Sequence, residues 1–389
     1  RDPRLWQCNA MKKRTFVLFI AVLLTACGGR TDGSTADTNT PPSDGDSPLQ
    51  DATESDGTTA TKDSVSIPDS PPAPDTARPP IQSTYETFIG DWNMKPGKEV
   101  TKCVRKRLDN ETAIWVTAIQ TQLSQGSHHL IVYKSTEETE ILEPENCAPF
   151  TETLGGETVP LMITQVTEET LELPAGVAFK FEPNQMIRLE AHYLNYYAED
   201  ISAHSDVTFQ TIAEEDVVHE ADMLFYGTPD FDIPPGEEYT TPWHFIDVWE
   251  DTKIFAITGH THQYGTNVEI SASTSNNDPG LSIYPKDTPF AWDEAPIEQF
   301  SPPLNFGAGE GLRYRCTWNN TSTQSVGFGE SANKEMCFLW AYYYPSNGYR
   351  MCVSPGDIAS GFDLGEQVCC PDDAWLCDLI KGFLSSGGF

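Results

Sequence analysis

Basic residues are scarce in this 389-residue chain, which has 24 Lys and Arg against 58 Asp and Glu and a formal net charge of −34. Nucleic-acid binding needs clustered Lys and Arg to neutralise phosphates, so the composition argues against nucleic acid as a partner. Long apolar runs are missing too, since none reaches the roughly 18 residues that identify a membrane-spanning helix. We therefore do not expect a multi-pass membrane protein.

Aromatic residues are absent from residues 31–80, where Thr, Asp, Pro and Ser dominate. A segment of this composition buries too little apolar area to offset the entropy of ordering it. Its prolines keep it extended and semi-stiff. The sequence therefore predicts a disordered linker, which we place at residues 28–84.

The segment before this linker has the pattern of a secretory signal. From Met11, three basic residues precede a short apolar run, and small residues follow it around Cys27. The sequence Leu-Thr-Ala-Cys that ends at Cys27 resembles the lipobox of bacterial lipoproteins, which implies that Cys27 is diacylated. The alternative is a coincidental Cys beside an ordinary cleavage site. We expect a bacterial cell-envelope protein with a membrane lipid anchor, and Gly28 and Gly29 after the Cys favour the outer membrane.

Helices are hard to find in the rest of the chain, where Asp373–Leu384 is the best candidate. Short runs rich in Val, Ile, Tyr, Phe and Trp alternate instead with Pro, Gly, Asn and Asp, which predicts strands. These runs are Ala113–Ile119, Leu130–Tyr133, Met186–Tyr197, Val207–Ile212, Lys253–Ile257, Asn267–Ser271 and Met336–Tyr344.

This pattern predicts an all-β fold of sandwiches or jelly rolls. An acidic stretch near Glu214–Asp222 suggests a boundary between two consecutive antiparallel β-sandwiches. The expected organisation is an upstream extension and signal peptide (1–27), the linker (28–84), an N-terminal sandwich (85–215), a C-terminal sandwich (216–350) and a Cys-rich extension (351–389).

Five of the eight histidines fall in three compact motifs: His128-His129, His192, and His260-Thr-His262. In a strand, residues i and i+2 share a face, so His260 and His262 can bind one ion. His128 and His129 point to opposite faces unless the strand begins or bulges there, and the preceding Ser-Gln-Gly supplies such an irregularity. Each motif alone is more often a hydrogen-bonded part of a β core. Three together favour a metal site.

The ordered motifs, continued by Glu335-Met336-Cys337 and a Tyr-Tyr-Tyr-Pro sequence, resemble the copper type II, ascorbate-dependent monooxygenases of the peptidylglycine α-hydroxylating and dopamine β-monooxygenase type. The resemblance runs over nearly all of residues 85–350. It implies one copper on each sandwich, the two facing each other across a solvent-filled cleft. The implied ligands are His128, His129 and His192 for the first copper, and His260, His262 and Met336 for the second.

The ligand types agree with this resemblance. Three imidazoles suit a copper that only transfers an electron, whereas two imidazoles and a soft thioether favour Cu(I), the state that binds O₂. Zn²⁺ rarely recruits a thioether, and no HExxH motif suggests a zinc hydrolase. Alone, Met336 would be read as filler of the core.

The implied function is a monooxygenase that hydroxylates a C–H bond of a small-molecule substrate. It would use O₂, two coppers and a one-electron reductant such as ascorbate. The alternative is a non-catalytic copper-binding surface lipoprotein on the same scaffold. No protein partner is indicated.

Ten cysteines fit an exported chain. Cys103 and Cys147 flank the His128 motif, and Cys316 and Cys337 flank the Met336 segment; both spacings resemble disulfides of the family. The four remaining C-terminal cysteines allow three pairings, among which the sequence does not choose. They are Cys352, Cys369, Cys370 and Cys377.

Three positions depart from the family pattern. Its peptide-hydroxylating members hold a substrate carboxylate with an Arg, an Asn and a Tyr, and the matching residues here are Thr258, Phe338 and Trp340. A planar cation and two polar groups are replaced by a hydroxyl and two hydrophobic rings, so this clamp is lost. We expect an apolar or aromatic substrate pocket and no α-amidation of peptides.

Four further residues lie outside the implied ligand sets. Glu190, two residues before His192, either orients a ligand or is a solvated strand residue. His204, His219 and His244 match no ligand of the family, and we expect them to be solvated or packed.

Overall fold

The computed structural model describes residues 77–148, 150, 158–286, 288–329, 331, 333–354, 367–370 and 377. Cys27, the signal segment, most of the linker and all of Asp373–Leu384 except Cys377 lie outside them, so acylation of Cys27 stays a prediction. The described residues all belong to one compact unit. None of the helices among them has the length and apolar character to cross a membrane.

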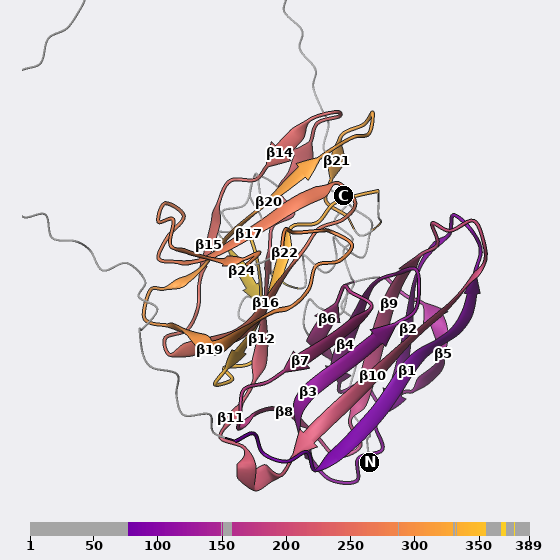
Figure 1. Cartoon of the computed structure of the whole chain (residues 1–389), viewed down its shortest axis with the longest axis vertical. Coiled ribbons are helices and arrows are strands. Elements are labelled where there is room, and N and C mark those ends of the chain that lie inside the picture. Colours follow the sequence, from indigo (N-terminus) through magenta and orange to yellow (C-terminus); the bar gives the residue numbers. More distant parts are fainter. Residues whose placement is uncertain are drawn as a thin grey trace, which may run out of the picture. The chain divides into compact units, whose positions relative to one another are not determined.

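The strands up to residue 220 form two sheets, called here the N-terminal sheets (Figure 1). One has the order β1-β10-β3-β8-β11, with β7 also paired to β3, and the other has the order β5-β2-β9-β4-β6. Their bounds are β1 Ser83–Met94, β2 Glu99–Arg107, β3 Ile114–Leu123, β4 Ser127–Ser135, β5 Ile141–Asn146, β6 Thr158–Thr164, β7 Glu168–Glu172, β8 Val177–Phe181, β9 Met186–Leu194, β10 Ile201–Ile212 and β11 His219–Glu220. A short 3₁₀ helix, η2, covers Glu214–Asp216.

The later strands form three further sheets, the C-terminal sheets. Their orders are β19-β16-β22-β12-β23-β24, then β14-β20-β17-β18 with β15 paired to β20, and the small pair β13-β21. The bounds are β12 Asp222–Gly227, β13 Asp232–Ile233, β14 Glu238–Thr240, β15 His244–Asp247, β16 Thr252–His260, β17 Gly265–Ser273, β18 Leu281–Tyr284, β19 Glu298–Phe306, β20 Gly311–Asn319, β21 Val326–Gly327, β22 Phe338–Tyr344, β23 Arg350–Val353 and β24 Val368–Cys370.

The all-β fold class is thus confirmed for the part of the chain described. No sheet there combines strands from before and after residue 221. That each group of sheets is a jelly-roll sandwich, and that each is a separate domain, stay predictions.

Strand β22 explains how the two groups of sheets pack. Successive side chains of a strand point to opposite faces, and every residue of β22 is buried. Phe338, Trp340 and Tyr342 enter a core cluster shared with the N-terminal sheets. Leu339 and Tyr343, on the other face, enter a second cluster within the C-terminal sheets.

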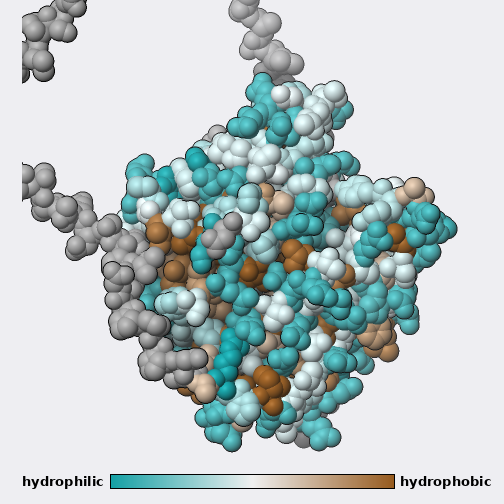
Figure 2. Space-filling model, viewed as in Figure 1, coloured by the Kyte–Doolittle hydropathy of each residue, from teal (hydrophilic) through white to brown (hydrophobic). Residues whose placement is uncertain are grey.

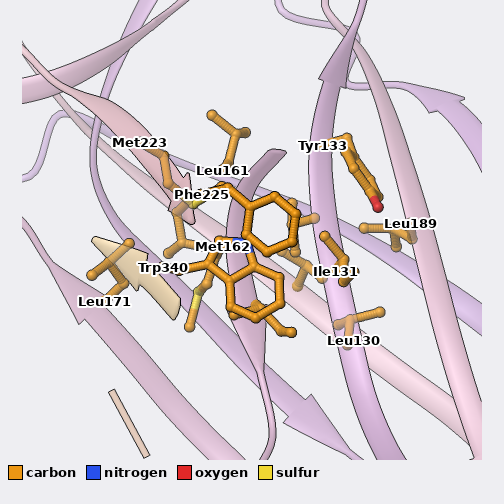
Figure 3. Close-up of a cluster of buried hydrophobic side chains, with 14 of the residues drawn as sticks. Leu130, Ile131, Tyr133, Leu161, Met162, Leu171, Leu189, Met223, Phe225 and Trp340 are labelled. Carbon is orange, nitrogen blue, oxygen red and sulfur yellow. The ribbon is translucent and has the colours of Figure 1, made fainter. Parts of the chain in front are cut away.

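Figure 3 shows part of the shared cluster, where Trp340 and Phe225 lie among side chains of β4 and β6. The two rings stack with centroids 4.5 Å apart. Tyr342 adds a polar contact, because its hydroxyl accepts a 3.2 Å hydrogen bond from the backbone N–H of Ile163 in the edge strand β6. Burial of this apolar area, about 25 cal/mol per Å², holds the two groups of sheets together.

Hydrophilic residues cover most of the face drawn in Figure 2, where hydrophobic residues form small separate patches. Isolated exposed apolar residues are normal on a soluble surface. Two large exposed side chains, Tyr196 and Tyr197, are neighbours. Both line a cavity that His128 also lines.

Candidate metal centre

The His128-His129 pair sits on an irregularity at the start of β4, as the sequence predicts. The pairing of β4 with β9 shifts between Ser127 and His129, so His128 is the extra residue of a bulge. Gly126 makes the preceding turn possible, because its φ of +86° favours glycine and a Cβ there would meet the Ile201 side chain at 2.3 Å. The bulge allows both imidazoles to serve one site.

The other three histidines come from two strand ends. His192 lies in β9 directly opposite His129. His260 is the last residue of β16 and His262 follows two positions later. The ring centroids of His260 and His262 lie 5.2 Å apart. The two predicted pairs, His128 with His129 and His260 with His262, are therefore both close together in the structure.

All five histidines converge on one place. Their ring centroids lie between 5.0 and 5.7 Å apart in seven pairs. One nitrogen from each of His128, His129 and His260 lies within 4.8 Å of the other two. The two expected triads were predicted to face each other across a solvent-filled cleft. That expectation is wrong at the histidines, because the shared core draws the two groups of sheets into contact and buries all five rings.

All five imidazoles are buried, and burial favours the neutral form of four of them. None is more than 4% exposed. Burial first, and neighbouring imidazoles second, lower the pKa of His128, His129 and His260 well below the ordinary histidine value. The same two causes lower the pKa of His262 to about 4. Neutral imidazole is the form that binds a metal.

Seven ring nitrogens in this cluster have no hydrogen-bond partner among the described residues. They are both nitrogens of His128 and of His129, Nδ1 of His192, and Nε2 of His260 and of His262. A buried polar atom without a partner costs about 1–3 kcal/mol. Several such atoms gathered among five neighbouring rings are the expected sign of a metal site, and imidazole nitrogens suit copper. The residues present therefore fit the metal that the sequence suggests.

In His262 and His192, one ring nitrogen has a hydrogen-bond partner and the other has none among the described residues. Nδ1 of His262 lies 3.0 Å from the carbonyl oxygen of Lys334, which only accepts, so Nδ1 carries the proton. Nε2 of His192 lies 2.9 Å from a carboxylate oxygen of Glu99. The opposite nitrogen of each ring keeps its lone pair for an ion.

Met336 belongs to a segment bound tightly to the His262 turn. The side chain is 1% exposed and belongs to the shared core cluster. Its neighbour Glu335 accepts hydrogen bonds from the backbone N–H of His262 at 2.8 Å and of Tyr264 at 2.7 Å, and from the indole N–H of Trp318 at 2.8 Å. Burial raises the pKa of Glu335 to about 7, although these donors favour the carboxylate. The sequence placed Glu335 in the Met336 motif but gave it no role.

Replacing Glu335 with leucine is expected to destabilise the metal-free protein by about 3–6 kcal/mol, since three buried N–H groups lose their acceptor. Glu335→Gln retains an oxygen acceptor and should cost less. Urea unfolding followed by circular dichroism compares the two variants. Equal small effects would mean that Glu335 does not hold the two segments together.

Four disulfide bonds are present in the described part. Two join the cysteines paired by the resemblance, Cys103–Cys147 and Cys316–Cys337. The second ties the residue after Met336 to β20. The C-terminal cluster adopts one of its three possible pairings, Cys352–Cys369 and Cys370–Cys377.

Comparison with known sequences agrees with this geometry. Residues 220–361 match the family model described as copper type II ascorbate-dependent monooxygenase, C-terminal domain. That stretch contains His260, His262 and Met336. Residues 220–361 thus carry the C-terminal domain of the copper type II ascorbate-dependent monooxygenase family. Copper is the metal this family uses, which supports copper in this chain.

A curated relative, DBH-like monooxygenase protein 2 of Mus musculus, is 26% identical over 210 residues, or 50% of this chain and 33% of the relative. The chain thus spans about a third of that protein's length. Among solved structures, the major capsid protein P2 of bacteriophage PM2 aligns with a TM-score of 0.30 and 10% identity over 68% of this chain and 99% of that one. Sulfolobus turreted icosahedral virus gives 0.24 and 10%, over 68% and 89%. TM-scores this low do not establish a shared fold.

A cavity of about 710 Å³ in this monooxygenase-like scaffold is lined by His128 of the histidine cluster. Three aromatic residues line it (Tyr196, Tyr197 and Trp292), and the Trp292 ring lies 5.3 Å from that of His128. Two carboxylates, Asp293 and Glu294, line it as well, and its lining contains no Lys or Arg among the described residues. Burial, with Glu99 and Asp293 nearby, raises the pKa of Tyr196. The cavity is therefore aromatic and negative.

The three residues expected to form the substrate pocket lie elsewhere. Thr258 and Trp340 are fully buried and Phe338 is 5% exposed. None of them lines this cavity. Trp340 instead packs near the metal centre, with its ring 5.8 Å from that of His260. Contact of these residues with a substrate stays a prediction.

Glu190 takes neither of its two expected roles. It is fully buried, so the solvated alternative is wrong. Its carboxylate pairs with Arg188 at 3.3 Å and accepts the N–H of Phe150 at 2.8 Å. The Phe150 ring lies 5.0 Å from that of His129. Glu190 thus places a ring against the histidine cluster.

The remaining histidines stay outside the cluster. His204 pairs with Asp91 at 2.8 Å and with Asp206 at 3.1 Å. His244 stacks on Tyr314 with centroids 5.4 Å apart. His219 is partly buried.

Proposed function

We propose that the chain is a copper-dependent monooxygenase that hydroxylates a C–H bond of a small molecule. One observation carries the proposal: five buried imidazoles lie in one cluster, and each has at least one nitrogen without a hydrogen-bond partner among the described residues. His128, His129 and His192 would hold an electron-transfer copper, and His260, His262 and Met336 an oxygen-activating copper. Bound copper would supply stepwise reduction of O₂ with electrons from a reductant such as ascorbate.

The protein's own contribution is positioning and exclusion of water. Lys334 and Glu99 set the tautomers of two ligands through hydrogen bonds. Trp340 and Phe150 cover the cluster with apolar rings. A dry site limits side reactions of reactive oxygen species.

The cavity is lined by His128 of the electron-transfer set, whose ring lies 5.7 Å from that of His260 and 5.6 Å from that of His262. A substrate bound there would approach the oxygen-activating set past the His128 ring.

The aromatic, negative lining favours a neutral or cationic aromatic substrate. Flat rings pack well against Tyr196, Tyr197 and Trp292. A positive group would find Asp293 and Glu294 at the rim. A carboxylate would meet like charge there.

Metal analysis of the purified full-length chain tests the proposal. We expect two coppers per chain, and fewer in a His128→Ala variant. His204→Ala is the matched control, because His204 pairs with carboxylates outside the cluster. Oxygen uptake with ascorbate and an aromatic substrate then separates the enzyme from the non-catalytic copper-binding alternative. One tightly bound zinc and no copper would contradict both.

A further inference from the structure

Gln165 connects the two groups of sheets at the metal centre. It follows the edge strand β6 of the N-terminal sheets and is 2% exposed. Its side-chain partners all belong to the C-terminal part of the chain. Its Nε2 donates to the carbonyl oxygen of Gly259 at 2.9 Å and lies 3.3 Å from the Thr258 hydroxyl and 3.4 Å from the Ala295 carbonyl oxygen. Its Oε1 lies 2.6 Å from Nδ1 of His260.

These contacts fix the protonation of His260. Carbonyl oxygens only accept hydrogen bonds, so the Gln165 atom that faces Gly259 must be the amide nitrogen. The amide oxygen then faces His260, and Nδ1 of His260 must donate to it. Nε2 of His260 is left with its lone pair, and it is one of the unpartnered nitrogens of the cluster. The amide of Gln165 thus selects the tautomer that can bind a metal.

The hydrogen bond between Gln165 and His260 also makes the tautomer of His260 depend on contact between the N-terminal and C-terminal sheets. Gln165 and His260 lie on different groups of sheets, so their hydrogen bond exists only when the groups are in contact. Other hydrogen bonds accompany it across the same boundary, including Ile163 with Tyr342 and the N–H of Ile297 with Glu169 at 3.2 Å. Separation of the sheets would free the His260 ring to rotate and change tautomer.

We propose that Gln165 is a positioning residue that holds His260 in its metal-binding tautomer and links this to closure of the two groups of sheets. The inference rests on the proposed copper function. By reciprocity, a metal held through His260 stabilises the closed arrangement. Loss of a hydrogen-bond partner of a metal-ligating histidine lowers metal affinity by about 10–100-fold.

Three variants separate positioning from simple loss of a buried amide. Gln165→Leu removes both ends of the bridge. Gln165→Glu, when protonated, keeps an oxygen acceptor for His260 and an O–H donor for Gly259. Gln185→Leu is the matched control, because Gln185 is a buried amide that bonds Ser135 and Glu182 within the N-terminal sheets.

Competition with a Cu(I) chelator measures copper affinity in the full-length chain. We expect Gln165→Leu to weaken binding of the copper held through His260 by about 10–100-fold. Gln165→Glu should restore part of that loss, and Gln185→Leu should leave the affinity at the wild-type value. In a His260→Ala background, Gln165→Leu should have no further effect, because the residue acts through His260. Equal affinities for the two leucine variants, or an undiminished effect without His260, would overturn the proposal.

A readout without metal keeps this inference distinct from the proposed function. Imidazole ¹⁵N chemical shifts of the metal-free protein should show His260 protonated on Nδ1 in the wild type and a mixture of tautomers in Gln165→Leu. An unchanged tautomer would overturn the role of Gln165 whatever metal binds. A wild-type chain that shows the tautomer but binds no copper would remove the proposed function alone.

Discussion

Met336→Ile is expected to abolish O₂-dependent turnover while the three-histidine set of His128, His129 and His192 keeps its copper. The thioether is the one soft ligand proposed, and a hydrocarbon side chain cannot replace it at Cu(I). Met336 is 1% exposed in the shared core. Isoleucine retains most of its volume, so folding should change by less than about 1.5 kcal/mol. Oxygen uptake with ascorbate, together with copper counted per chain, measures the two effects separately.

Met351→Ile is the matched control for this experiment. Met351 lies in β23, is 4% exposed and belongs to the same core cluster as Met336. It should keep full activity and both coppers. Full activity in Met336→Ile would show that Met336 only fills the core.

Strand positions followed from the sequence because local side-chain pattern determines them. All seven predicted runs overlap strands of the structure. The run Met336–Tyr344 began two residues early, since β22 starts at Phe338. The two residues before it belong to the segment that Glu335 and the Cys316–Cys337 disulfide hold against the His262 turn. Hydrophobicity alone does not distinguish a strand residue from such a buried segment.

Residues that act through distant partners could not be identified in the same way. Gln165 and His260 are 95 positions apart, and Glu335 reaches His262 over 73. Neither Gln165 nor Glu335 stands out in its local sequence. The bulge at His128 was predictable because its cause, the turn at Gly126, lies next to it.

The sequence also did not show that the two expected copper triads lie together in one buried cluster, because this too depends on contacts between distant parts of the chain. Each triad was visible as short motifs, whereas their separation depends on how whole sheets pack. The sequence feature that indicates this packing is β22, where seven consecutive residues are apolar or aromatic. A continuous run of that kind indicates a strand buried on both faces. One of those faces brings the C-terminal sheets against the N-terminal ones.

Peptides that end in glycine are expected to be poor substrates, and phenethylamine-like compounds better ones. The cavity at His128 offers Asp293 and Glu294 but no described basic residue to a substrate carboxylate. Two like charges about 4 Å apart repel by about 1 kcal/mol in water, or about fivefold in affinity for each carboxylate met. Steady-state kcat/KM for the two substrate classes measures this preference. Exchanging Asp293 and Glu294 together for Asn and Gln should narrow it.

A basic group reaching over the cavity from elsewhere would reverse this preference. Two arginines of the C-terminal sheets, Arg313 and Arg350, have other partners. Arg313 donates to the carbonyl oxygen of Asp278 at 2.9 Å and lies over the ring of Trp243. Arg350 donates to the carbonyl oxygen of Asp247 at 3.3 Å and lies 5.0 Å from the centroid of a Trp ring. If the peptides nevertheless give the higher kcat/KM, the carboxylate must bind outside this cavity, and the substrate route proposed beside His128 is wrong.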